Sequence, residues 1–143
     1  MRIYIASVFV DDLQKAHDFY VDKLGFVLKD SVKNEHYWWL TVTNPDGGTE
    51  LLLEPNAHPA AQAYTAALRA DGIPATQFLS EDVTAETAAL KEKGVEFVTE
   101  PTDYGHSVVS AFDDTCGNII QLVQLKIGHN RHLTVTKSSQ MSL

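Results

Sequence analysis

The order of structural signals in the first half of this 143-residue chain recurs in the second half, about 70 residues later. In each half an apolar strand pattern leads into two acidic residues, an amphipathic helical stretch, a glycine and a further strand pattern. Asp11-Asp12 and Gly25 mark these positions in the first half, and Glu81-Asp82 and Gly94 mark them in the second. The repeat indicates two copies of one supersecondary unit.

Each copy is predicted to have the order β-α-β-β-β. Alternating apolar residues predict the strands, and acidic N-cap residues before apolar positions spaced three and four apart predict the helices. Gly25 and Gly94 are expected to end these helices, because glycine readily takes the left-handed conformation of a helix C-terminus. The predicted strands span 3–10, 26–32, 37–43, 49–54, 75–79, 95–99, 107–112 and 118–124, and the predicted helices span 13–24 and 83–93.

The expected fold class is therefore α+β, with two tandem β-α-β-β-β modules that form a cupped mixed sheet and carry their helices on the outer face. The modules are placed at about 1–55 and 75–125 of a single domain spanning 1–125, with an alanine-rich connecting helix at 58–72. Residues 126–143 are assigned to a C-terminal tail, which is predicted to be mobile because its Ser-rich end has little to pack.

The charge of the chain is unevenly distributed. Residues 1–125 combine eight basic with nineteen acidic side chains, a net charge of −11, while Lys126, Arg131 and Lys137 give the tail +3. An acidic surface repels phosphate backbones and anionic lipids, so neither nucleic acid nor a membrane is expected as a partner. The sequence has no long apolar run and no secretory signal pattern, which predicts a soluble, cytoplasmic protein. The single cysteine, Cys116, is interpreted as an inert turn residue.

Side-chain alternation predicts which residues face the concave side of the sheet. If Val8 and Val10 pack beneath the first helix, the alternate residues of that strand turn into the cup. The same parity turns residues of other strands inward, and Tyr104 is a candidate lid. The predicted ligand-binding residues are Ser7, Phe9, Tyr37, Trp39, Glu50, Leu52, Tyr104 and Gln121. Aromatic walls with few polar groups are typical of a site for a planar organic ligand, although the same rings can simply fill the cup.

Two segments resemble a known family. The motif V-D-D-L-x-K-A-x-D-F-Y-x-x-K-L-G-F at residues 10–26 and the motif F-D-D-T-C-G-N-I-I-Q-L at 112–122 are similar to those of the vicinal oxygen chelate superfamily. This superfamily contains glyoxalase I, extradiol dioxygenases, and the fosfomycin and bleomycin resistance proteins. The resemblance covers residues 3–125 and implies the paired-module fold. It also implies that an enzyme of this kind would hold one divalent metal in the cup through His, Glu or Gln side chains.

The metal-ligand positions that the resemblance implies fall on or near Ile5, Glu50, Ala75 and Gln121. Isoleucine and alanine cannot coordinate a metal, and Glu50 with Gln121 supplies fewer donors than the three protein ligands of a typical catalytic site. No metal and no other cofactor is therefore expected, and a divalent metal in a substituted site is the alternative. Glu50 is the one catalytic candidate, as a general base whose pKa burial could raise, and a plain hydrogen-bonded polar pair is the competing interpretation.

Three functions stay open on this sequence. The leading hypothesis is a glyoxalase/bleomycin-resistance-like protein that binds a small aromatic or amphipathic molecule without metal and forms a homodimer, as the resemblance implies. The first alternative is a metal-dependent lyase or dioxygenase of the same superfamily with an altered metal site. The second alternative is an interaction scaffold. Whether the protein is an enzyme is not decided by these residues.

Overall fold

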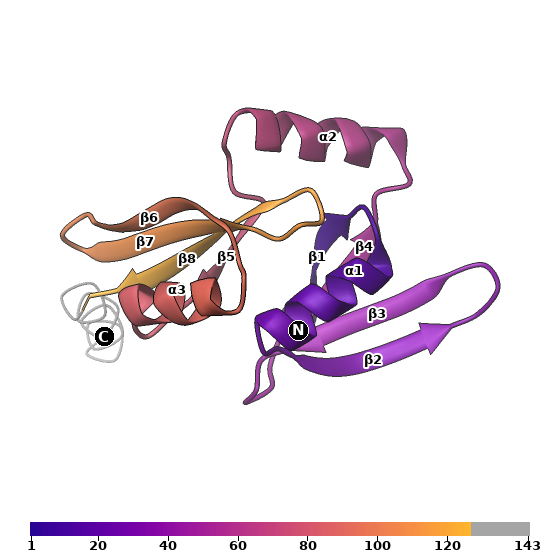
Figure 1. Ribbon diagram of the computed structural model, residues 1–143. Helices are drawn as coiled ribbons and strands as arrows, with labels where there is room; N and C mark the ends of the chain where they lie inside the picture. Colours follow the sequence, from indigo (N-terminus) through magenta and orange to yellow (C-terminus); the bar gives the residue numbers. More distant parts are fainter. Residues whose placement is uncertain (127–143) are drawn as a thin grey trace, which may run out of the picture.

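The computed structural model describes residues 1–126 and contains two modules in sequence, joined by a helix (Figure 1). The first module consists of β1 (Ile5–Val10), α1 (Leu13–His17), the π-helical segment η1 (Asp18–Lys23), β2 (Val27–Lys33), β3 (Trp38–Thr43) and β4 (Glu50–Pro55). After the connecting helix α2 (Pro59–Ala70), the second module consists of β5 (Thr76–Leu79), α3 (Val83–Glu92), β6 (Phe97–Asp103), β7 (Ser107–Asp113) and β8 (Ile119–Leu125). The predicted α+β class and the tandem β-α-β-β-β modules are confirmed. The predicted mobility of the tail concerns residues that, beyond Lys126, lie outside the described part of the chain.

Each module forms its own four-stranded mixed sheet. Sheet A has the order β1-β4-β3-β2, and sheet B has the equivalent order β5-β8-β7-β6. In both sheets the first strand of the module pairs in parallel with the last strand, and the other pairs are antiparallel. The parallel pairs align Ile5 with Glu50 in sheet A and Gln77 with Gln121 in sheet B. As a result β1 and β5 are edge strands, and no backbone ladder joins them within residues 1–126.

Equivalent caps begin and end the helices of the two modules. The carboxylate of Asp12 accepts from the backbone N–H of Lys15, and the carboxylate of Asp82 accepts from that of Ala85. An acidic N-cap stabilises a helix because it satisfies an otherwise unpaired N–H and carries negative charge at the positive end of the helix dipole. Gly25 has a φ of 82° and Gly94 a φ of 88°, the left-handed conformation expected after a helix. The repeat in the sequence is thus a repeat in local hydrogen bonding.

The first helix differs from its prediction in its second half. Regular α-helix ends at His17, and the chain continues through η1, where the N–H of Leu24 donates to the carbonyl of Phe19. This wider turn buries the two neighbouring residues Phe19 and Tyr20, which are 6% and 0% exposed. An uninterrupted stripe with helical spacing contains Tyr20 but not Phe19. The π-helical turn therefore adds one aromatic ring to the buried face.

One hydrophobic core serves both modules and lies between their sheets. Helix-facing residues of sheet A, such as Val10 and Leu53, share it with residues of sheet B such as Ile120. The ring centroid of Phe19 in η1 lies 6.0 Å from that of Phe112 in β7. Each sheet therefore has one face on the shared core and a second face, here termed its open face, that points away from it.

Among the described residues, no helix has the length and apolar character needed to span a membrane.

A buried polar cluster joins the turn before β8 to the first module. The carboxylate of Asp114, which is 0% exposed, accepts from the hydroxyl of Tyr20 at 2.7 Å and from the side-chain amide of Asn118 at 2.8 Å. It also accepts from the backbone N–H groups of Cys116 and Asn118. Burial raises the pKa of Asp114 above its ordinary value, although these hydrogen bonds counteract part of the rise. The cluster fixes the contact between the modules.

Candidate functional site

The open face of sheet A carries five of the predicted ligand-binding residues. Strand register places Ser7 of β1 beside Leu52 of β4, and alternation puts the other three on the same face. The Trp39 side chain is 36% exposed, whereas Glu50 is 7% exposed at the start of β4. Leu52 is also 7% exposed, so the exposed part of this face is formed by Ser7 and Trp39. The five residues are Ser7, Phe9, Trp39, Glu50 and Leu52.

A short row of hydrogen bonds holds the Glu50 carboxylate. The hydroxyl of Thr41 donates to Oε1 of Glu50 at 2.9 Å and accepts from the backbone N–H of Asp30 at 3.1 Å. Thr41 is 0% exposed, so its hydroxyl needs these partners to offset the loss of hydration. The partner of Glu50 is thus Thr41, a residue two positions after Trp39 on the same face. The register sets Thr41 opposite Leu52, so the Glu50 carboxylate lies next to Thr41 and farther along the sheet from the indole of Trp39.

Gln121 lies on the open face of the other sheet. Its side-chain N–H donates to Oε1 of Gln77 at 3.0 Å across the parallel pair of β5 and β8. Gln77 also lines a cavity of about 240 Å³ together with Glu50, where the start of β4 approaches β5. Gln77 therefore hydrogen-bonds Gln121 and shares a cavity with Glu50, and no hydrogen bond joins Glu50 to Gln121 among the described residues.

The two remaining predicted residues lie in exposed connections. Tyr37 precedes β3 and is 56% exposed, and its backbone N–H donates to the side chain of Asn34. Tyr104 lies in the turn between β6 and β7 and is 60% exposed. Neither tyrosine belongs to the core. Their roles as a wall and a lid of a binding site stay predictions.

The positions that correspond to family metal ligands do not fit a divalent metal within the described chain. The side chain of Ile5 has no atom that can coordinate a metal. The side chains of Glu50 and Gln121 form hydrogen bonds with those of Thr41 and Gln77. Among residues 1–126, no three His, Cys, Asp or Glu side chains gather closely enough to hold a metal ion. A catalytic metal needs three protein donors or more in a fixed geometry.

Cys116 is buried in the turn before β8, beside Asp114. Burial raises the pKa of its thiol to about 12, with a further contribution from the negative charge of Asp114. The thiolate, which is the nucleophilic form, is therefore scarce at neutral pH. This agrees with the interpretation of Cys116 as an inert turn residue.

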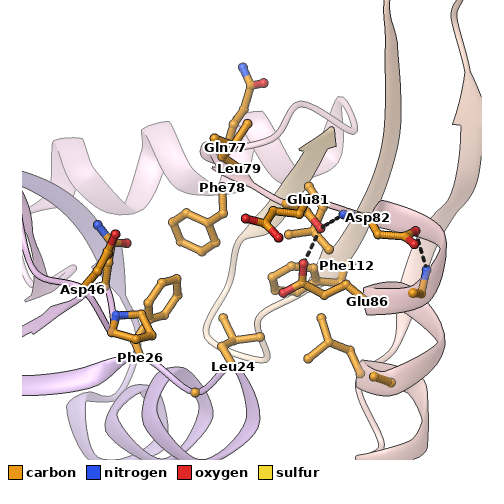
Figure 2. A pocket seen from close by; sticks show the side chains of 18 residues that line it. Leu24, Phe26, Asp46, Gln77, Phe78, Leu79, Glu81, Asp82, Glu86 and Phe112 are labelled. Carbon is orange, nitrogen blue, oxygen red and sulfur yellow. Dashed lines mark hydrogen bonds between the residues drawn. The ribbon is translucent and has the colours of Figure 1, made fainter. Parts of the chain in front are cut away.

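A larger cavity, of about 1000 Å³, lies in a groove between the two modules (Figure 2). None of the eight predicted ligand-binding residues lines it. The groove combines the turn between β3 and β4 with the segment from β5 into α3, which are more than 30 residues apart in the chain. No periodicity or motif in either segment indicates a site. The side chains that matter most for its chemistry are Leu24, Phe26, Asp46, Phe78, Glu81, Asp82, Glu86 and Phe112.

Comparisons with known proteins agree with this architecture. Residues 2–122 match the model of the Glyoxalase/Bleomycin resistance protein/Dioxygenase superfamily. Uncharacterized protein YurT of Bacillus subtilis is 50% identical over 126 residues, covering 87% of this chain and 99% of YurT. The crystal structure of UcmS2 matches with a TM-score of 0.75 and 25% identity, over 86% of this chain and 97% of UcmS2.

A second solved structure carries a functional description. TnmS3, an antibiotic binding protein from Streptomyces sp. CB03234, matches with a TM-score of 0.71 and 29% identity, over 88% of this chain and 97% of TnmS3. The family model spans both modules and the two motifs at 10–26 and 112–122. The chain belongs to the Glyoxalase/Bleomycin resistance protein/Dioxygenase superfamily.

Proposed function

We propose that this protein binds a small planar organic molecule on the open faces of its sheets, without a metal. The observation that supports this most is the partly exposed indole of Trp39, which lies on an uncovered face near the buried Thr41–Glu50 pair. A flat aromatic surface beside a few fixed polar groups suits stacking and orientation of a planar ligand. The likeness to TnmS3, an antibiotic binding protein, supports a small-molecule ligand.

We further propose that a second copy of the chain completes the pocket. Small-molecule sites usually bury most of the ligand surface, which one sheet face does not achieve. The outer edges of β1 and β5 lack a strand partner within residues 1–126, and apolar Ile3 and Leu79 beside them are 78% and 74% exposed. Unpaired edges with apolar surface favour association. Joining β1 of one copy to β5 of the other would bring sheet A of one copy against sheet B of its partner.

Ligand binding is tested by the fluorescence of Trp39 in titrations of the full chain with a library of planar aromatic compounds. A binding compound is expected to quench it saturably. Replacing Trp39 with alanine is expected to weaken binding about tenfold, because a stacked aromatic surface is lost. Trp38, whose indole N–H donates to Ser31 on the other face, supplies a signal that should stay constant. A library without any effect on Trp39 would contradict ligand binding and favour the scaffold alternative.

Association through the β1 edge is tested by sedimentation over a range of concentrations. The wild-type chain is expected to form a dimer. Ile3→Asp is expected to weaken the dimer about tenfold or more, since it puts a charge where the interface would bury an apolar side chain. Tyr64→Asp is the matched control, because Tyr64 is 59% exposed on α2, which belongs to neither sheet. A monomeric wild-type protein, or equal effects of the two substitutions, would rule out this interface.

A further inference from the structure

We propose that the groove between the modules is a second binding site, which takes an amphipathic amine, meaning an aromatic or alkyl body that carries an ammonium group. Gln77 and Leu79 of β5 line the rim of this groove, but its floor, formed by Phe26 and Phe78, is on the core side of both modules and therefore differs from the open faces of the proposed function. Three properties of the groove support this assignment: its size and apolar floor, its charge, and the freedom of two of its carboxylates.

The floor of the groove is apolar and has the size of a small-molecule site. Phe26 and Phe78 meet there edge to face, with ring centroids 5.0 Å apart, and the Phe78 ring points into the groove (Figure 2). Leu24 extends the same surface, and the buried ring of Phe112 lies beneath it. The volume of about 1000 Å³ is at the upper end of the range usual for ligand pockets. The apolar part of a ligand, one ring or a short alkyl chain, can therefore be buried against this floor and removed from water.

Among residues 1–126, four carboxylates and no Lys, Arg or His side chain line the rim of the groove. Asp46 lies on one side of Phe78, and Glu81 lies on the other side with Glu86 (Figure 2). Like charges around one low-dielectric concavity repel each other and create a negative potential, which attracts a cation and repels an anion. The rim thus selects for positive charge on the ligand.

Two of the four carboxylates already have a role in the fold, and two do not. Asp82 caps α3 by accepting from the N–H of Ala85, and Glu86 accepts from the hydroxyl of Ser80. Asp46 and Glu81 have no hydrogen bond or ion pair to any residue among 1–126, and both are exposed. They are free to pair with a ligand cation. Since no three His, Cys, Asp or Glu side chains gather as metal ligands in the described part of the chain, an organic ammonium ion suits the groove better than a metal ion.

The proposal is tested with 4-phenylbutylamine, compared with 4-phenylbutan-1-ol and 4-phenylbutyrate as neutral and anionic probes of the same shape. In an NMR titration of the ¹⁵N-labelled full chain, the amine is expected to shift the amide resonances of residues between Gln77 and Ala89. The alcohol is expected to bind about fivefold more weakly, because it lacks the ion pairs, and the carboxylate is expected not to bind. Added salt should weaken the binding of the amine and leave the binding of the alcohol unchanged.

Substitutions of the two free carboxylates give the decisive comparison. Asp46→Asn with Glu81→Gln is expected to reduce amine affinity about fivefold and to leave the alcohol unchanged. The double variant Glu35→Gln with Asp71→Asn is the control, because it removes the same charge outside the groove. It is expected to change neither the affinity for the amine nor that for the alcohol. Equal binding of the three probes, resonance shifts centred on Trp39 and Thr41, equal losses in the two double variants, or no binding of the amine would each overturn the proposal.

Discussion

Replacing Phe112 with alanine is expected to lower the free energy of unfolding by about 3–5 kcal/mol, the usual cost of removing a fully buried aromatic ring. Phe112 is 0% exposed in β7 and contacts the rings of Phe19 and Phe97, at centroid distances of 6.0 and 5.6 Å. One of these partners belongs to the first module and the other to the second. The cavity left by the substitution would therefore weaken the contact between modules as well as the interior of the second one.

Urea denaturation followed by circular dichroism measures this effect. The wild-type chain is expected to unfold in one transition, because both modules share a single core. Tyr104→Ala is the control, since Tyr104 is 60% exposed in the same module and its loss should cost less than about 0.5 kcal/mol. A loss below about 1 kcal/mol for Phe112→Ala, or two wild-type transitions, would show that the modules are held together in another way.

Replacing Asp114 with alanine is expected to cost about 3 kcal/mol, because the hydroxyl of Tyr20 and the side-chain amide of Asn118 would lose a buried acceptor. Tyr20→Phe removes only the hydroxyl of the same pair and should cost about 1–2 kcal/mol. Thermal and urea unfolding of both variants measure the difference. Equal stability of the Asp114→Ala variant and the wild type would mean that water replaces the carboxylate without loss.

The same carboxylate predicts a pH dependence of stability. Burial raises the folded-state pKa of Asp114 above the ordinary value of 3.8, so the folded protein binds the proton more tightly than the unfolded chain does. The contribution of Asp114 to the free energy of unfolding is therefore greatest below pH 3.8, and it falls as the pH rises through the folded-state pKa. Asp114→Asn cannot titrate. The stability of the wild type relative to this variant should fall across that window, and a constant difference would contradict the raised pKa.

Local signals were sufficient to predict most of the elements. The Asp12 and Asp82 caps and the two glycines after the helices act through hydrogen bonds within a few residues, so they are visible in a single sequence. Alternation was equally informative, since Val8 and Val10 are buried and Ser7 is exposed. The π-helical turn of η1 escaped prediction because its i to i+5 bonding depends on where Phe19 finds a partner, and that partner is Phe112, in the other module.

By itself the sequence determined the repeat, the α+β class, the strand faces and the family, because each depends on local pattern or on motifs that stay contiguous in the chain. The tertiary structure alone decided how the modules meet. It placed both helix-covered faces on one core and created the groove between Asp46 and Glu81. These features join segments that are distant in the chain, and they follow from burying apolar surface of two modules against each other. The periodicity of apolar residues within one segment carries no information about how the two modules pack against each other.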